Sequence, residues 1–271
     1  MYHFLEKCEE DKLLHLAVHI AFICSLRAGE TAGIELKTID MADGSLWIMG
    51  EIERVSDQSL ATLPKNEIFR VFPKQVSGSK SSLILKGPKT EGSYRKQYLP
   101  APLLVEIKER IEQIQKHMEF YGEEYQDYGL LTCHPDGRPF DPKSFNKMFK
   151  EQQRQMQIEE QDQIEFQELR KSGQMHKVRL TKNNYQLVAE NNGQSPEVLM
   201  SNYNEALEEE KRALAVMIEQ SFYPRKENAD PHSGDQVSSV LQMIQSDPEI
   251  TRQVLQALLL GVVHAQADNT F

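Results

Sequence analysis

Apolar residues recur at intervals of three and four positions in two stretches of the chain. The first stretch covers residues 13–26, and its apolar positions are Leu13, Leu16, Ala17, Ile20, Ala21 and Cys24. The second begins at Pro100 and extends to about Tyr121, and its apolar positions are Leu103, Leu104, Ile107, Ile111 and Ile114. This spacing predicts two amphipathic helices, each with one buried face.

Three short segments near the N-terminal third predict β-strands. They cover residues 44–50, 82–86 and 95–99, and glycine or proline lies beside them. The last two are joined by residues 87–92, so we expect a hairpin that carries Lys89. The pattern as a whole predicts a mostly helical α+β fold with a small antiparallel sheet.

A further helix is expected to begin at Asp141 and Pro142, because aspartate suits the N-cap and proline the first helical position. One face of this helix carries four cations at offsets of 0, 4, 7 and 11, namely Lys143, Lys147, Lys150 and Arg154. The other side carries Phe145, Met148 and Phe149 for the core. A basic stripe is usually only a solvated face, so DNA binding by these four residues is a hypothesis that needs other support.

The net charge of −10, from 31 basic and 41 acidic residues in 271, argues at first against a nucleic-acid partner. The acidic excess is uneven, however. Residues 1–100 hold 13 basic and 13 acidic groups, residues 101–200 hold 13 and 17, and residues 201–271 hold 5 and 11. The excess is concentrated toward the C-terminal tail, which leaves room for a locally basic face upstream.

Several classes of protein are disfavoured by the sequence. The longest mostly apolar stretch, residues 13–24, is interrupted by two histidines and is too short for a membrane span. Residues at the N-terminus show no secretory pattern. Cys8, Cys24 and Cys133 have no C-x-x-C spacing, which argues against disulfides or a zinc knuckle. We expect a reduced, cytoplasmic protein that has no membrane partner.

The C-terminal part has a different composition. Residues 224–236 are polar and contain the helix breakers Pro224, Pro231 and Gly234, as is typical of a linker. Apolar periodicity returns from Val237 to His264, where Pro248 divides the pattern into two short helices. We therefore expect a main domain at 1–223, a linker at 224–236 and a helical tail at 237–271.

Five motifs along the main domain resemble those of one family. They are Arg27-Ala28-Gly29-Glu30, Lys89 in its hairpin, Phe166-Gln167-Glu168-Leu169-Arg170, Gly193-Gln194-Ser195-Pro196, and Tyr203, nine residues after Gln194. Their order and spacing resemble the R-x-G-E, hairpin lysine, F-H-D-L-R, Gly-His-Ser-Ser and nucleophile motifs of tyrosine recombinases, also called phage integrases. The resemblance covers about residues 5–223.

The resemblance implies a tyrosine-recombinase catalytic domain that recombines or integrates the DNA of a mobile element. Arg27 and Arg170 would bind the phosphate bidentately, Lys89 would protonate the departing 5′ oxygen, and Tyr203 would be the nucleophile. Neither a cofactor nor a metal is implied, and double-stranded DNA and further copies of the chain are the expected partners. Family members usually carry an N-terminal core-binding domain, which we expect to be absent here through excision or natural truncation.

Two departures from the family motifs leave a second function open. Gln167 and Gln194 stand where the family usually has histidine, and a glutamine amide can donate a hydrogen bond but cannot shuttle a proton near neutral pH. The alternative is therefore a catalytically inactive integrase-like protein that binds DNA or regulates a relative. A third interpretation is an interaction module whose acidic tail binds protein.

His15 and His19 have the i, i+4 spacing that can hold zinc on one helix face. No third ligand with suitable spacing follows them, and both interleave with the apolar stripe. From the sequence alone we expect no metal site.

Overall fold

The computed structural model describes residues 2–8, 10–88, 93–204 and 215–218. The chain divides into two compact units, Met1–Glu208 and Glu209–Phe271. In the second unit, residues 215–218 are helical. The predicted linker and tail, residues 224–271, lie outside the described residues. Everything below concerns the first unit.

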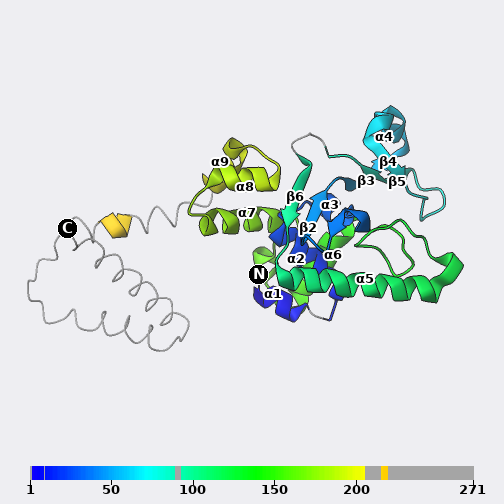
Figure 1. The fold of residues 1–271 in the computed structure, drawn as a ribbon, viewed down its shortest axis with the longest axis horizontal. Helices are drawn as coiled ribbons and strands as arrows, with labels where there is room; N and C mark the ends of the chain where they lie inside the picture. Colours follow the sequence, from blue (N-terminus) through cyan, green and yellow to red (C-terminus); the bar gives the residue numbers. More distant parts are fainter. Residues whose placement is uncertain (1, 9, 89–92, 205–214, 219–271) are drawn as a thin grey trace, which may run out of the picture. The chain divides into compact units, whose positions relative to one another are not determined.

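Helices make up most of the first unit, as predicted (Figure 1). The α-helices are α1 (Tyr2–Lys7), α2 (Lys12–Ile23), α3 (Ala28–Ala32), α4 (Asp57–Thr62), α5 (Ala101–Tyr121), α6 (Pro142–Gln155), α7 (Glu168–Leu180), α8 (Tyr185–Asn192) and α9 (Pro196–Asn204). The 3-10 turns are η1 (Leu36–Thr38), η2 (Lys65–Glu67), η4 (Gly122–Glu124) and η5 (Glu160–Asp162). Within the described part of the chain, no helix is both long and apolar enough to cross a membrane.

The strands form two small antiparallel sheets. The strands are β1 (Ile39–Asp40), β2 (Ser45–Ile48), β3 (Glu51–Ser56), β4 (Ile68–Val71), β5 (Ser81–Lys86) and β6 (Arg95–Tyr98). One sheet has the order β1-β2-β6 and the other β3-β5-β4. All three predicted strands are present, but the predicted hairpin between β5 and β6 is wrong, because β6 pairs with β2 and β5 pairs with β3 and β4.

Helix α2 lies at the centre of the unit and is buried on more than one face. Leu14, Ala17 and Val18 pack in a core with α6, α7 and the β3-β5-β4 sheet. Leu16 and Ile20 pack in a second core with β2 and α5. The prediction of a single buried face is therefore incomplete, because a helix that is apolar nearly all round is stable between two cores.

The long helix α5 and the start of α6 agree with the sequence prediction. The Asp141 side chain accepts a hydrogen bond from the Lys143 backbone N–H at 3.0 Å, so it caps α6 as expected. Phe145 and Phe149 are buried, and Met148 packs against the same core. The apolar side of α6 therefore turns inward.

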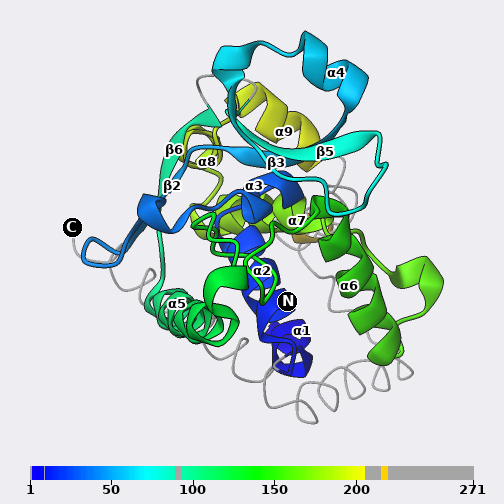
Figure 2. The ribbon, with the colours of Figure 1, turned by 90° about the vertical axis from the view of Figure 1, so that its right-hand side faces the viewer.

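Helix α7 packs very closely on α2, and Gly173 makes this approach possible (Figure 2). A Cβ atom at position 173 would lie 2.1 Å from the carbonyl oxygen of Phe22. That atom is backbone and cannot rotate away. The packing of α7 on α2 therefore requires glycine at this position.

Replacing Gly173 with alanine tests this packing. In an ordinary helix this change stabilises by up to about 1 kcal/mol, but here we expect a loss of about 1–3 kcal/mol, because the helices must separate. Urea denaturation of the full chain measures the difference. Ser172→Ala, one position away on the exposed side of α7, should change the free energy of unfolding by less than about 0.5 kcal/mol. Equal stability of the two variants would contradict the close approach.

Candidate active site

A tight turn at the end of α2 sets the position of Arg27. Ser25 has a positive φ of 51°, and the Leu26 N–H donates to the carbonyl oxygen of Ala21 at 2.9 Å. Leu26 is fully buried, which anchors the turn. Arg27 then stands at the N-cap position of α3, and its side chain is 47% exposed.

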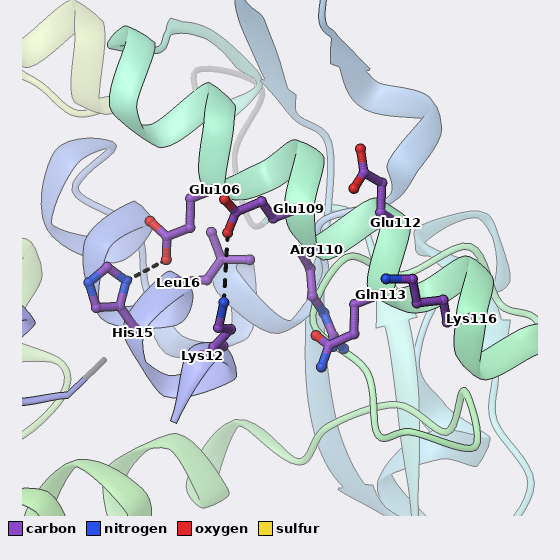
Figure 3. Close-up of a pocket in the computed structure, with 9 residues that line it drawn as sticks. All are labelled: Lys12, His15, Leu16, Glu106, Glu109, Arg110, Glu112, Gln113 and Lys116. Carbon is purple, nitrogen blue, oxygen red and sulfur yellow. Dashed lines mark hydrogen bonds and ion pairs between the residues drawn. The ribbon is translucent and has the colours of Figure 1, made fainter. Parts of the chain in front are cut away.

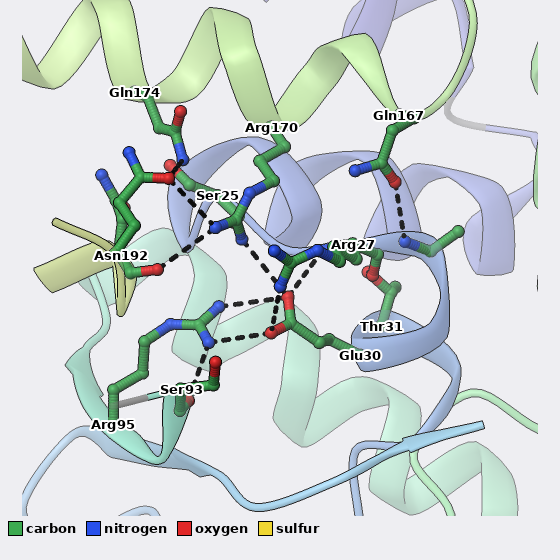
Figure 4. A network of polar contacts seen from close by, with 12 residues as sticks. Ser25, Arg27, Glu30, Thr31, Ser93, Arg95, Gln167, Arg170, Gln174 and Asn192 are labelled. Atoms are coloured by element: carbon green, nitrogen blue, oxygen red, sulfur yellow. Dashed lines mark hydrogen bonds and ion pairs between the residues drawn. The ribbon is translucent and has the colours of Figure 1, made fainter. Parts of the chain in front are cut away.

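Glu30 lies almost completely buried beneath Arg27, with 2% of its surface exposed (Figure 4). Arg95, which comes from β6, donates to its two carboxylate oxygens at 2.8 and 3.2 Å. The Arg27 backbone N–H donates to the same carboxylate at 2.7 Å. Glu30 thus joins the turn after α2 to the β1-β2-β6 sheet.

Arg170 reaches the same carboxylate from α7. Its guanidinium donates to the carbonyl oxygen of Ser25 at 2.6 Å, to Glu30 at 3.4 Å and to the carbonyl oxygen of Asn192 at 3.3 Å. Phe166, just before α7, is buried against the rings of Phe145 and Phe149 on α6. The start of α7 is therefore held by aromatic packing while Arg170 is held by hydrogen bonds.

The guanidinium groups of Arg27, Arg95 and Arg170 all contact the one carboxylate of Glu30. Burial opposes ionisation of Glu30, but the hydrogen bonds and charge of Arg95 outweigh it, so the pKa of Glu30 is lowered. Burial lowers the pKa of Arg170 to about 10, although Glu30 acts in the opposite direction. Both groups remain ionised at neutral pH. The cluster has more positive than negative charge, which favours an anionic ligand.

Lys177 adds a further, partly buried cation on α7. Its ammonium donates to the side-chain oxygens of Asn191 and Asn192 at 2.7 and 3.1 Å. Burial lowers the pKa of Lys177 to about 8. Sequence reasoning missed Lys177, Arg95 and Asn192 as neighbours of the site, because their proximity arises only from the packing of α7, α8 and β6.

The two glutamines lie on either side of Arg170. Gln167 is exposed, and its side-chain oxygen accepts from the Ala28 N–H at 3.4 Å. Gln194 follows Gly193, whose φ of 61° ends α8 in the left-handed conformation that glycine tolerates. The side-chain oxygen of Gln194 accepts from Arg170 at 3.5 Å and from Gln174 at 3.3 Å.

Two buried amide donors beside Arg170 have no acceptor. They are Nε2 of Gln194 and Nδ2 of Asn192, for which the described residues supply no hydrogen-bond partner. A buried donor without an acceptor is costly. The described structure therefore leaves two polar groups unsatisfied next to the buried guanidinium of Arg170.

The structure brings together four of the six predicted catalytic positions: Arg27, Gln167, Arg170 and Gln194. Lys89 lies outside the described residues. Tyr203 lies in α9, but its side chain is not described. The roles of all six residues stay predictions.

The predicted cationic face of α6 divides into two pairs. Lys150 forms an ion pair with Glu165, and Arg154 forms one with Glu151. Lys143 and Lys147 are exposed, and no ion pair to either one occurs among the described residues. The side chains of Lys143 and Lys147 are therefore the more available for a phosphate.

The surroundings of His15 and His19 correct one expectation. The Glu106 carboxylate, on α5, lies 2.5 Å from Nδ1 of His15 and 2.7 Å from Nδ1 of His19. Burial opposes ionisation of Glu106, but its hydrogen bonds with His19 and His15 lower its pKa. The expectation that the two histidines have no third ligand is therefore wrong, because α5 is distant in sequence but packs beside α2.

Glu30→Gln tests the central carboxylate. It leaves buried guanidiniums without their counter-charge, so we expect a loss of about 3–5 kcal/mol at neutral pH. Because the pKa of Glu30 is lowered in the folded chain, the stabilisation is complete above its ordinary value of 4.5 and is lost as pH falls through the lower folded value.

Urea denaturation at several pH values measures this difference in stability. The difference in the free energy of unfolding between wild type and Glu30→Gln should decrease as the solution becomes more acidic than pH 4.5. Glu119→Gln, at an exposed position of α5, is the matched control and should change stability little. A gap that does not depend on pH would contradict the ionised state of Glu30.

Comparison with known proteins adds a structural likeness. No protein-family model matches the sequence, and no curated protein matches it. A structure of the Tn1549 transposon integrase in complex with a circular intermediate DNA has a TM-score of 0.55 at 14% identity, covering 78% of this chain and 63% of that one. Another structure of this integrase, in complex with transposon right end DNA, has a TM-score of 0.51 at 13% identity. The match covers 77% of this chain and 64% of that one. This chain thus spans just under two thirds of those structures, and its fold is that of a tyrosine recombinase catalytic domain.

Proposed function

We propose that this chain binds double-stranded DNA and carries out site-specific recombination through cleavage and rejoining of strands by Tyr203. The observation that carries the proposal is the joint placement of Arg27 and Arg170 on Glu30, with unpaired amide donors beside them. The similar Tn1549 integrase structures are DNA complexes, which supports the choice of DNA as the anion. In this proposal residues 1–223 are the catalytic domain, and copies of the chain assemble on DNA of a mobile element in the cytoplasm.

The proposed reaction exchanges one phosphodiester for another. The Tyr203 oxygen attacks the phosphorus, the bond from phosphorus to the 5′ oxygen breaks, and a 3′-phosphotyrosyl link forms. Arg27 and Arg170 stabilise the added charge on the non-bridging oxygens. Lys89 donates a proton to the departing 5′ oxygen, and the tyrosine proton passes to water. Attack by a 5′ hydroxyl then rejoins the strand, so no cofactor is required.

Glutamine at positions 167 and 194 favours a second candidate function, a DNA-binding or regulatory relative that does not cleave. Acid–base assistance contributes about 10²–10⁴ to a reaction rate, and an amide cannot provide it. Both glutamines can still hydrogen-bond a phosphate oxygen. The two functions therefore share DNA binding and differ only in chemistry.

Trapping of a covalent adduct tests strand cleavage. We expect the full chain to form a denaturant-resistant adduct with a pool of nicked duplexes of randomised sequence, since loss of the short 5′-hydroxyl fragment prevents rejoining. The double variant Gln167→His with Gln194→His should form it faster by about 10²-fold or more. Gel electrophoresis of labelled DNA measures the yield.

Tyr203→Phe is the matched control, because it removes only the attacking oxygen. An adduct that persists in this variant would place the nucleophile elsewhere. Failure of both the wild-type chain and the double histidine variant to form any adduct would reject cleavage and leave the DNA-binding alternative.

Neutralising pairs of cations on α6 tests the DNA-binding face. Lys143→Gln with Lys147→Gln should weaken binding and lower the slope of log affinity against log salt by about 2, or about one per lost phosphate contact. Lys150→Gln with Arg154→Gln should have a smaller effect, because these cations are already paired with Glu165 and Glu151. Fluorescence anisotropy with a labelled random-sequence duplex at several salt concentrations measures both.

The two double variants remove the same charge from the same helix and are controls for each other. Equal losses of DNA affinity in the two variants would mean that only the total charge of α6 matters. If neither variant lost DNA affinity, α6 would not be part of the DNA interface.

A further inference from the structure

Two histidines of α2 and a glutamate of α5 form a compact cluster between these helices, before the turn that carries Arg27. His15 and His19 are one helical turn apart, and their rings lie edge to face with centroids 6.0 Å apart. Both Nδ1 atoms point at the carboxylate of Glu106, one at each oxygen. One atom from each of the three side chains lies within 4.8 Å of the other two.

We propose that His15, His19 and Glu106 bind a divalent transition-metal ion of the Zn²⁺ class. Two imidazoles and one carboxylate are a ligand set that Zn²⁺ accepts, whereas Mg²⁺ and Ca²⁺ prefer oxygen alone. The three side chains leave a coordination position for water, as three-ligand zinc sites do.

The present distances are close to those an ion requires. Bonds of about 2.0–2.1 Å in tetrahedral geometry separate neighbouring ligand atoms by about 3.3 Å, and the Nδ1-to-carboxylate distances are 2.5 and 2.7 Å. Each Nδ1 atom must therefore move by less than about 1 Å relative to the carboxylate oxygen that it now contacts. His15 and His19 are 23% and 16% exposed, so their outer edges have room for this movement.

Binding also changes which nitrogen of each ring carries a hydrogen. An ionised carboxylate only accepts, so Nδ1–H of each ring is the donor to Glu106 in the metal-free cluster. A metal ion needs the lone pair of Nδ1, so this hydrogen must leave Nδ1, and Nε2 on the outer side of each ring carries the remaining N–H. The ion then replaces two hydrogen bonds by two coordinate bonds and keeps the carboxylate as its counter-charge.

The surroundings allow a cation to enter. His15 and Glu106 line a pocket of about 590 Å³ (Figure 3). Three basic groups, Lys12, Arg110 and Lys116, also line it. Lys12 lies 4.0 Å from Glu109 and is 73% exposed, and Arg110 donates to the carbonyl oxygens of Leu131 and Cys133. Among the described residues, none of the three forms an ion pair with Glu106.

A bound ion would fix α2 to α5. Helix α2 continues into the Ser25 turn that positions Arg27, but the cluster touches none of the residues of the candidate active site. The proposed ion lies apart from the candidate active site, so the proposal does not depend on the proposed function.

Metal titration of the full, untagged chain tests the site. After dialysis against a chelator, calorimetry with Zn²⁺ should show one binding event that Mg²⁺ does not reproduce, and Co²⁺ should give the visible absorption of a low-coordinate nitrogen and oxygen site. His15→Gln with His19→Gln should weaken Zn²⁺ binding by at least about 100-fold, since the loss of a residue that merely supports a ligand already costs about 10- to 100-fold.

The matched control is His117→Gln with His176→Gln, which removes two histidines outside the cluster and should keep the wild-type affinity. If circular dichroism shows that the His15 and His19 variant does not fold, Glu106→Gln serves as the second test of the site. It keeps the shape of the side chain, and Zn²⁺ should raise the Tm of the wild type but not of this variant. The proposal would be overturned if the cluster variants bound Zn²⁺ as tightly as the wild type. It would also be overturned if the wild type did not bind Zn²⁺.

Discussion

Glu30 is buried where three parts of the chain meet, and its carboxylate is the contact they share. The turn after α2, the β1-β2-β6 sheet and α7 each supply a guanidinium to it. A buried charge is tolerable only when it is paired and hydrogen-bonded. The buried guanidinium groups of Arg95 and Arg170 therefore require Glu30 as their counter-charge, and this one carboxylate links α3, α7 and β6.

A second set of contacts connects the candidate pocket to the cationic face of α6. Asn146 on α6 accepts from the Phe166 N–H at 2.8 Å, and Gln153 accepts from the Ile164 N–H at 2.9 Å. These contacts attach the segment before α7 to α6, while the Phe166 ring packs on the apolar side of the same helix. A ligand held by Lys143 and Lys147 would therefore rest on the helix that also supports the position of Arg170.

Local sequence signals predicted much of this fold but few of its long-range pairings. The periodicity of α5 and the Asp141 cap of α6 are properties of adjacent residues, and both were predictable. The partner of β6 was not, because strand pairing depends on residues far apart in the chain. The order of the motifs suggested that Arg27, Gln167, Arg170 and Gln194 meet. Arg95, Lys177 and Glu106 gave no comparable signal, since a charged residue in a strand or helix is usually exposed.

The network around Glu30 gives Arg170 a structural role that does not depend on any reaction. Arg170 already has acceptors in Ser25, Glu30 and Asn192, and none of these bonds involves proton transfer to a substrate. The stability of the fold alone therefore requires Arg170 and Glu30, and Gln194 takes part in the same network through its contact with Arg170. An intact pair of arginines at this place is thus a property of the folded scaffold and is not by itself a sign of strand cleavage.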